Sequence, residues 1–192
     1  MIDILKKEIT ESIKVKQLLL NSSNNLQVLK KLVNDCLESL KNGGKVIFCG
    51  NGGSFADSQH LTAEFISKLR FDRSPLPAIA LGTNSSNLTA IGNDYGFECI
   101  FERELVALHE KQDVFIPIST SGNSENVIRA IMKANELGVK TFGLTGINSG
   151  KIGDLCNTIK VPSNKTEKIQ ECHIMIGHII CSLIENEIFN GK

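Results

Sequence analysis

The chain has 192 residues, with 21 basic and 21 acidic side chains and a formal net charge of zero at pH 7. Nucleic-acid binders and membrane-surface binders need concentrated positive charge, and the sequence has no basic cluster, which argues against both classes. No apolar stretch reaches the roughly 20 residues of a bilayer span, and the N-terminus lacks the apolar core of a signal peptide. The six cysteines have no CxxC spacing. We therefore expect a reduced, cytoplasmic protein of one domain.

Two amphipathic helices are predicted at the start of the chain, separated by the helix-breaking segment 21–24. Two helices are more than a sheet needs for cover, so we expect residues 1–43 to be an extension used in oligomerisation and 44–192 to form the α/β core. The apolar stripe of the first helix comprises Ile2, Leu5, Ile9 and Ile13, and that of the second comprises Leu26, Leu29, Val33, Cys36 or Leu37, and Leu40.

Near-continuous apolar runs then alternate with segments of helical periodicity, which is typical of parallel strands covered on both faces. The expected fold is an α/β three-layer sandwich, flavodoxin-like or Rossmann-like, with a five-stranded parallel sheet flanked by helices. The last helix is apolar nearly all round, which predicts burial, here against another subunit. Strands are predicted over 45–50, 78–81, 114–120, 140–145 and 158–161, and helices over 55–69, 84–91, 96–108, 124–137 and 166–188.

Two loops of small residues, 49–54 and 119–124, each follow a predicted strand and lead into a predicted helix. Glycines let the backbone approach an anion, and the helix N-terminus directs free N–H groups at it, so both loops are candidate phosphate sites. The alternatives are a tight turn for the first loop and an ordinary helix cap for the second. The first loop lacks the GxGxxG spacing and the Walker lysine, which disfavours dinucleotides and ATP. The candidate phosphate donors are Ser54, Ser119, Ser121 and Ser124.

Two further pairs of side chains could carry chemistry. His60 and Glu64 are four residues apart in the helix after the first loop, so they share one face of it. They could form half of a metal site, an acid/base pair or a simple surface ion pair. Asn93 and Asp94 follow a predicted helix, where they form either an Asx turn or an acceptor for a substrate hydroxyl.

The last predicted helix carries three polar side chains among apolar ones. His173 is interpreted as a histidine satisfied by a buried hydrogen bond. Gln170 and His178 lie about two turns apart on one side and could face a site together.

Taken in this order, these motifs resemble the bacterial phosphoheptose isomerases, members of the sugar isomerase (SIS) domain group. The resemblance covers nearly the whole chain and implies conversion of D-sedoheptulose 7-phosphate into D-glycero-D-manno-heptose 7-phosphate through an enediol. This is the first step towards ADP- or GDP-heptose for lipopolysaccharide core or capsule. The resemblance also implies a homotetramer with active sites at subunit interfaces.

The resemblance further implies residue roles. Glu64 and His178 would be catalytic, and His60, Glu64, Gln170 and His178 would bind one zinc ion per subunit, at partial occupancy. One departure is Glu167, where the family has aspartate. The implied substrate-binding residues are Asn51, Gly52, Gly53, Ser54, Glu64, Asn93, Asp94, Ser119, Thr120, Ser121, Ser124 and Gln170.

Two non-enzymatic alternatives stay open at this point. A non-catalytic member of the same domain group binds the replication initiator, and other members sense sugar phosphates. The presence of His60, Glu64 and His178 together favours an enzyme over the first alternative. The sequence has no accompanying DNA-binding domain, which disfavours a sensing regulator.

Overall fold

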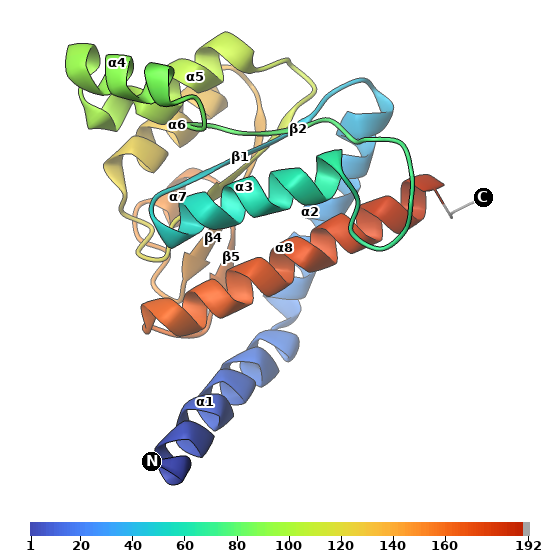
Figure 1. Ribbon diagram of the computed structural model, residues 1–192, viewed down its shortest axis with the longest axis vertical. Coiled ribbons are helices and arrows are strands. Elements are labelled where there is room, and N and C mark those ends of the chain that lie inside the picture. The colour runs from blue at the N-terminus through green and yellow to red at the C-terminus, as the bar shows by residue number, and fades with distance from the viewer. Residues whose placement is uncertain (190–192) are drawn as a thin grey trace.

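The computed structural model describes residues 1–189; residues 190–192 of the predicted domain lie outside the described residues. Two helices precede the sheet, α1 (Ile2–Leu20) and α2 (Ser23–Lys41). Ser22 caps α2 by accepting a hydrogen bond from the main-chain N–H of Asn25, which explains the predicted break between the helices. α1 extends away from the rest of the chain (Figure 1). Its apolar residues Ile2, Leu5, Ile9 and Ile13 are exposed.

The five predicted strands form one parallel sheet in the order β2-β1-β3-β4-β5. The chain leaves β1 for β2 on one side and returns to β3 on the other, so the strand order reverses between β1 and β3. Ligands of open α/β sheets bind outside the carboxyl ends of the strands at such a point. The strands are β1 (Val46–Gly50), β2 (Ala78–Ala80), β3 (Val114–Ile118), β4 (Lys140–Gly146) and β5 (Asn157–Val161).

Helices cover both faces of the sheet, as predicted, with two local differences. α4 continues to Tyr95, so Asn93 and Asp94 lie inside a helix and the predicted Asx turn is wrong. The short α7 was missed because one helical turn has no detectable period. The remaining helices are α3 (Gly53–Ile66), α4 (Ser85–Tyr95), the 3-10 helix η1 (Phe97–Cys99), α5 (Ile100–Leu108), α6 (Glu125–Glu136), α7 (Ile152–Leu155) and α8 (Thr166–Phe189).

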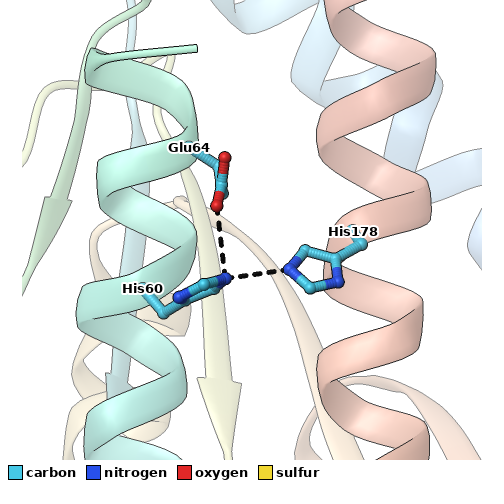
Figure 2. Close-up of side chains that lie close together, drawn as sticks. All are labelled: His60, Glu64 and His178. Carbon is cyan, nitrogen blue, oxygen red and sulfur yellow. Dashed lines mark hydrogen bonds and ion pairs between the residues drawn. The ribbon is translucent and has the colours of Figure 1, made fainter. Parts of the chain in front are cut away.

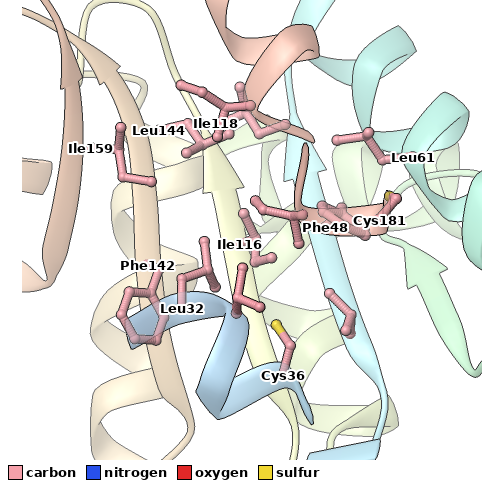
Figure 3. Close-up of a cluster of buried hydrophobic side chains, with 14 of the residues drawn as sticks. Leu32, Cys36, Phe48, Leu61, Ile116, Ile118, Phe142, Leu144, Ile159 and Cys181 are labelled. Carbon is pink, nitrogen blue, oxygen red and sulfur yellow. The ribbon is translucent and has the colours of Figure 1, made fainter. Parts of the chain in front are cut away.

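β1 and β3 are buried at every position because each face of the sheet has its own core. Lys140 of β4 and Asn157 and Lys160 of β5 are exposed. In β1, Val46 and Phe48 pack with α2, α3 and α8, whereas Ile47 and Cys49 pack with α5 and α6. Figure 3 shows part of the first core, where Leu32 of α2 and Leu61 of α3 meet the sheet. Burial of each such large side chain contributes about 1.5–3 kcal/mol, so both layers are firmly held to the sheet.

α8 is long and apolar enough, by length and composition alone, to cross a membrane, contrary to the expectation from the sequence. In the fold it packs beside α2, α3 and β4, and Cys172, Ile176 and Ile180 lie in the core. It is therefore a core helix by position. Ile179 and Leu183 nevertheless remain 38% and 45% exposed, so the predicted burial of α8 is only partial within one chain.

Candidate active site

α3 and α8 lie side by side and run in the same direction (Figure 1), which brings residues far apart in the sequence together. At the N-terminal end of α3, a Cβ on Gly53 would collide with the side-chain amide of Gln170. Further along, a Cβ on Gly177 would collide with the side chain of Leu61. The two glycines thus permit a close approach of the helices at a ligand loop.

Next to the second contact, His60 and Glu64 of α3 face His178 of α8, as Figure 2 shows. His60 Nε2 lies 2.9 Å from His178 Nε2 and 3.2 Å from Glu64 Oε1. The two rings meet edge to face, with 5.1 Å between their centroids. The side chain of His60 is 50% exposed and that of Glu64 is 18% exposed, so a ligand can reach the cluster from solvent.

The donor set of this cluster fits a metal ion. Within residues 1–189 it is the one group of at least three His, Cys, Asp or Glu side chains whose ligand atoms lie close enough together to hold one. The Nε2 atoms of the two histidines and a carboxylate oxygen of Glu64 meet here, and a single N–H donor cannot satisfy all three. Two nitrogen ligands of a tetrahedral zinc ion, each about 2.0–2.1 Å from the metal, are about 3.3 Å from each other. The distances from His60 Nε2 to His178 Nε2 and to Glu64 Oε1, 2.9 and 3.2 Å, are close to this value. The predicted fourth ligand, Gln170, lies two turns before His178 and contacts Gly53, outside this trio.

Asp57 is a carboxyl group beside this cluster that the sequence analysis missed. It precedes His60 by three residues on α3, and its Oδ2 is buried without a hydrogen-bond partner. Burial raises the pKa of Asp57, and the neighbouring His60 and His178 oppose that shift. The spacing of three residues to His60 was the sequence signal that could have placed Asp57 on the same helix face.

The first loop is tied to the second by an amide pair. The side chains of Asn51 and Asn126 exchange two hydrogen bonds, of 2.8 and 2.9 Å, across the reversal point between β1 and β3. Gly52, at φ +56°, then turns the chain into α3, a conformation that favours glycine. Ser54 follows and is buried. Asn126 was missed because a single asparagine inside a predicted helix resembles an ordinary surface residue.

The hydroxyl-rich second loop is not explained by helix capping. Ser124 is the N-cap residue of α6, yet its side chain makes no capping hydrogen bond. Its Oγ instead lies 3.0 Å from Ser119 Oγ, and either hydroxyl can be the donor. Thr120 and Ser121 line a polar cavity of about 310 Å³ at the carboxyl ends of β3 and β4. Ser124 and the first turn of α6 line a neighbouring hollow together with Asn51. Hydroxyls and the N-terminal end of a helix beside such hollows suit a phosphate group.

Three other polar candidates, Asn93, Asp94 and His173, are outside this cluster. Asn93 and Asp94 are exposed on α4, where the Asn93 amide donates to Asp94 at 2.7 Å. His173 is fully buried and Nε2 lies 3.2 Å from the carbonyl oxygen of Thr145, as its interpretation as a structural histidine requires.

Comparison with known proteins identifies the family of this chain. The family described as "SIS domain" matches residues 13–146. The phosphoheptose isomerase of Aneurinibacillus thermoaerophilus is 49% identical over 191 residues, which cover 99% of this chain and 96% of that protein. The solved phosphoheptose isomerase of Neisseria gonorrhoeae is 40% identical, with a TM-score of 0.86, covering 95% of this chain and 98% of that one. The solved phosphoheptose isomerase of Francisella tularensis is 35% identical, with a TM-score of 0.90, covering 95% and 97%. The chain therefore belongs to the phosphoheptose isomerase family of SIS-domain proteins.

Proposed function

We propose that this protein is a cytoplasmic aldose–ketose isomerase that converts D-sedoheptulose 7-phosphate into D-glycero-D-manno-heptose 7-phosphate. The observation that carries the proposal is the meeting of a carboxylate, Glu64, and an imidazole, His178, from two different helices, of which α3 begins at the first small-residue loop. The product would enter the synthesis of nucleotide-activated heptose for lipopolysaccharide or capsule. Relatives named phosphoheptose isomerase, which match this chain along nearly its whole length, favour this reaction over a non-catalytic role.

The reaction moves one proton between C1 and C2 of the sugar and another between the two oxygens. Glu64 would remove the carbon-bound proton, which forms the enediol, and would return it to the neighbouring carbon. His178 would transfer the second proton between the two oxygens. His60 lies between them, 3.2 Å from the carboxylate and 2.9 Å from the second imidazole, and so orients both groups.

The two small-residue loops would hold the remote part of the substrate. Ser119, Thr120, Ser121 and Ser124 would donate hydrogen bonds to the phosphate, with the N-terminus of α6 behind them. The first loop, held by the Asn51–Asn126 pair, would contact the sugar, together with Gly52, Gly53, Ser54 and Gln170. Asn93 and Asp94 remain candidate contacts to sugar hydroxyls. Binding energy from the phosphate would be used to orient C1 and C2 between the catalytic groups.

His60, Glu64 and His178 would hold a zinc ion, with Gln170 as a fourth ligand after a change of its side-chain rotamer, one ion per subunit. When bound, this ion would polarise the substrate carbonyl and stabilise the negative charge that develops on oxygen. A ligand set without thiolates binds zinc less firmly than a cysteine site, so we expect partial occupancy.

We further propose a homotetramer with active sites near subunit interfaces. Two observations support this assembly: the exposed apolar stripe of α1, and the exposed Ile179 and Leu183 of α8, which flank the position of His178. An uncovered apolar surface of this kind is typical of an interface. Light scattering is the direct test, and a monomer would contradict the assembly.

The decisive experiment is incubation of the purified protein with D-sedoheptulose 7-phosphate, following the aldoheptose phosphate, with chelator and with added zinc. Turnover that chelator abolishes and zinc restores would support both the reaction and the metal. Turnover that is indifferent to chelator would keep the Glu64/His178 mechanism and remove zinc from it. No turnover under either condition, with the oligomer intact, would refute the proposed function.

A further inference from the structure

A buried ion pair joins the end of α3 to α8. Arg73 Nε donates to Glu185 Oε1 at 3.0 Å, and the two side chains are only 3% and 1% exposed. The same carboxylate accepts hydrogen bonds from the main-chain N–H groups of Leu69, at 3.1 Å, and Arg70, at 3.0 Å. Since a buried charge that loses a partner is strongly destabilising, this arrangement tolerates little movement.

Arg73 also binds the backbone of the candidate catalytic base. The last carbonyls of a helix have no N–H partners within the helix. At the end of α3, Arg73 provides these missing donors: its Nη2 donates to the carbonyl oxygen of Glu64 at 2.7 Å, and its Nη1 donates to that of Phe65 at 2.6 Å. Its positive charge is also favourable at a helix C-terminus. One guanidinium therefore connects the main chain of Glu64 to the carboxylate of Glu185.

On α8, Glu185 lies seven residues after His178, which is about two helical turns, so both project from the same face. A close contact of the helices, Gly177 against Leu61, lies one residue before His178. Any slide of α3 along α8 would therefore break the Arg73–Glu185 contacts and, at the same time, separate Glu64 from His178.

We propose that the Arg73–Glu185 pair is a positioning device for the isomerase reaction, which sets the register of α3 against α8 and so keeps Glu64 opposite His178. Neither residue has a contact with the His60–Glu64–His178 side chains, so both are positioning residues and not catalytic ones. The kinetic consequence rests on the proposed function. A misplacement of about 1 Å between catalytic groups can cost about 100-fold in rate, so a loosened register is measurable.

The variant Arg73→Lys tests this, because lysine keeps the charge but lacks the planar fork that reaches Glu185 and two carbonyls together. We expect kcat to fall by about tenfold or more. We expect KM for D-sedoheptulose 7-phosphate to stay within about threefold, because the phosphate loop is untouched. Glu185→Gln keeps one acceptor for Arg73 and is a milder second variant if Arg73→Lys does not fold.

The matched control is Asp113→Asn. Asp113 is fully buried and pairs with Lys45 at 2.7 Å, beside the amino ends of β1 and β3 and therefore at the opposite edge of the sheet from the loops. This variant should lower the melting temperature and keep the wild-type kcat. A folded Arg73→Lys protein with wild-type kcat would overturn the proposal, and so would an equal loss of kcat in the control.

A second readout needs neither substrate nor metal. The Nε2 atoms of His60 and His178 are 2.9 Å apart, within hydrogen-bond distance, so with chelator present the ring nitrogen NMR shifts of the wild type should differ from those of free imidazole. In Arg73→Lys both sets of signals should move towards the free values, and in Asp113→Asn they should not. Unchanged signals in Arg73→Lys would overturn the positioning role. This result stands even if the wild type fails to isomerise the substrate, which would refute the proposed function alone.

Discussion

His173 predicts a pH dependence of stability that can be worked out from its surroundings. Its ring is fully buried between α8 and the sheet, Nε2 lies 3.2 Å from the Thr145 carbonyl oxygen, and Nδ1 has no partner. Burial disfavours the charged imidazolium and lowers the pKa of His173 from 6.5 to about 4, while the hydrogen bond to Thr145 opposes this shift.

The direction of the change in stability with pH follows from which state binds the proton. Between pH 6.5 and 4 the unfolded chain binds a proton at His173 and the folded chain does not, so stability falls as the pH falls through this window. Each pKa unit corresponds to about 1.4 kcal/mol, so between pH 7 and 4.5 this one histidine should cost about 2 kcal/mol of unfolding free energy. Below the folded pKa the loss is complete and no longer changes with pH.

The assay is urea unfolding of the wild type and of His173→Gln at several pH values, at one fixed protein concentration because an oligomer's stability depends on it. Glutamine can still donate to the Thr145 carbonyl but does not titrate. We expect the wild type to lose about 2 kcal/mol more than the variant between pH 7 and 4.5. Parallel pH curves for the two proteins would refute the reasoning, because they would mean that His173 is as easily protonated in the fold as in the unfolded chain.

Three other substitutions give further tests. Glu64→Gln should lower kcat by about 100- to 10,000-fold, because it removes the base. Substrate affinity should largely be kept, because the two small-residue loops are unchanged. Steady-state rates and calorimetric titration check the two expectations, and wild-type turnover would exclude Glu64 as the catalytic base. Gly53→Ala should displace the Gln170 amide and raise KM, a result that unchanged kinetics would contradict. Gly92→Ala, inside α4 with open space around its Cα, should raise the unfolding free energy by about 0.5–1 kcal/mol in thermal unfolding, and a destabilised variant would contradict this.

Much of the fold could be predicted because it depends on short-range patterns. Each of the five strands overlaps its predicted range. The signal is strongest in β1 and β3, which are buried at every position because both faces of the sheet are covered there. The errors lie where this pattern is absent. Asn93 and Asp94 resemble turn residues, yet α4 continues through them to Tyr95, and α7 is too short to show a period.

Part of the candidate site could also be predicted from local spacing, and part of it could not. The spacing of His60 and Glu64 places them on one face of any helix, and their contact at 3.2 Å depends on that spacing alone. The Asn51–Asn126 pair was not foreseen, because its two residues lie in different elements and neither motif indicates the other. The same holds for Asp57, whose meaning depends on its burial.

By itself, then, the sequence determined the five strands, most of the helices, the two small-residue loops between strand and helix, and the shared face of His60 and Glu64, because backbone preferences and helical spacing act over a few residues. Only the tertiary structure decided that His178 meets His60 across 118 residues of chain, and that Arg73 binds both Glu185 and the backbone of Glu64. Those contacts depend on which faces of α3 and α8 pack together and in what register. Side-chain packing over the whole core sets that register, and no local segment of the sequence contains it.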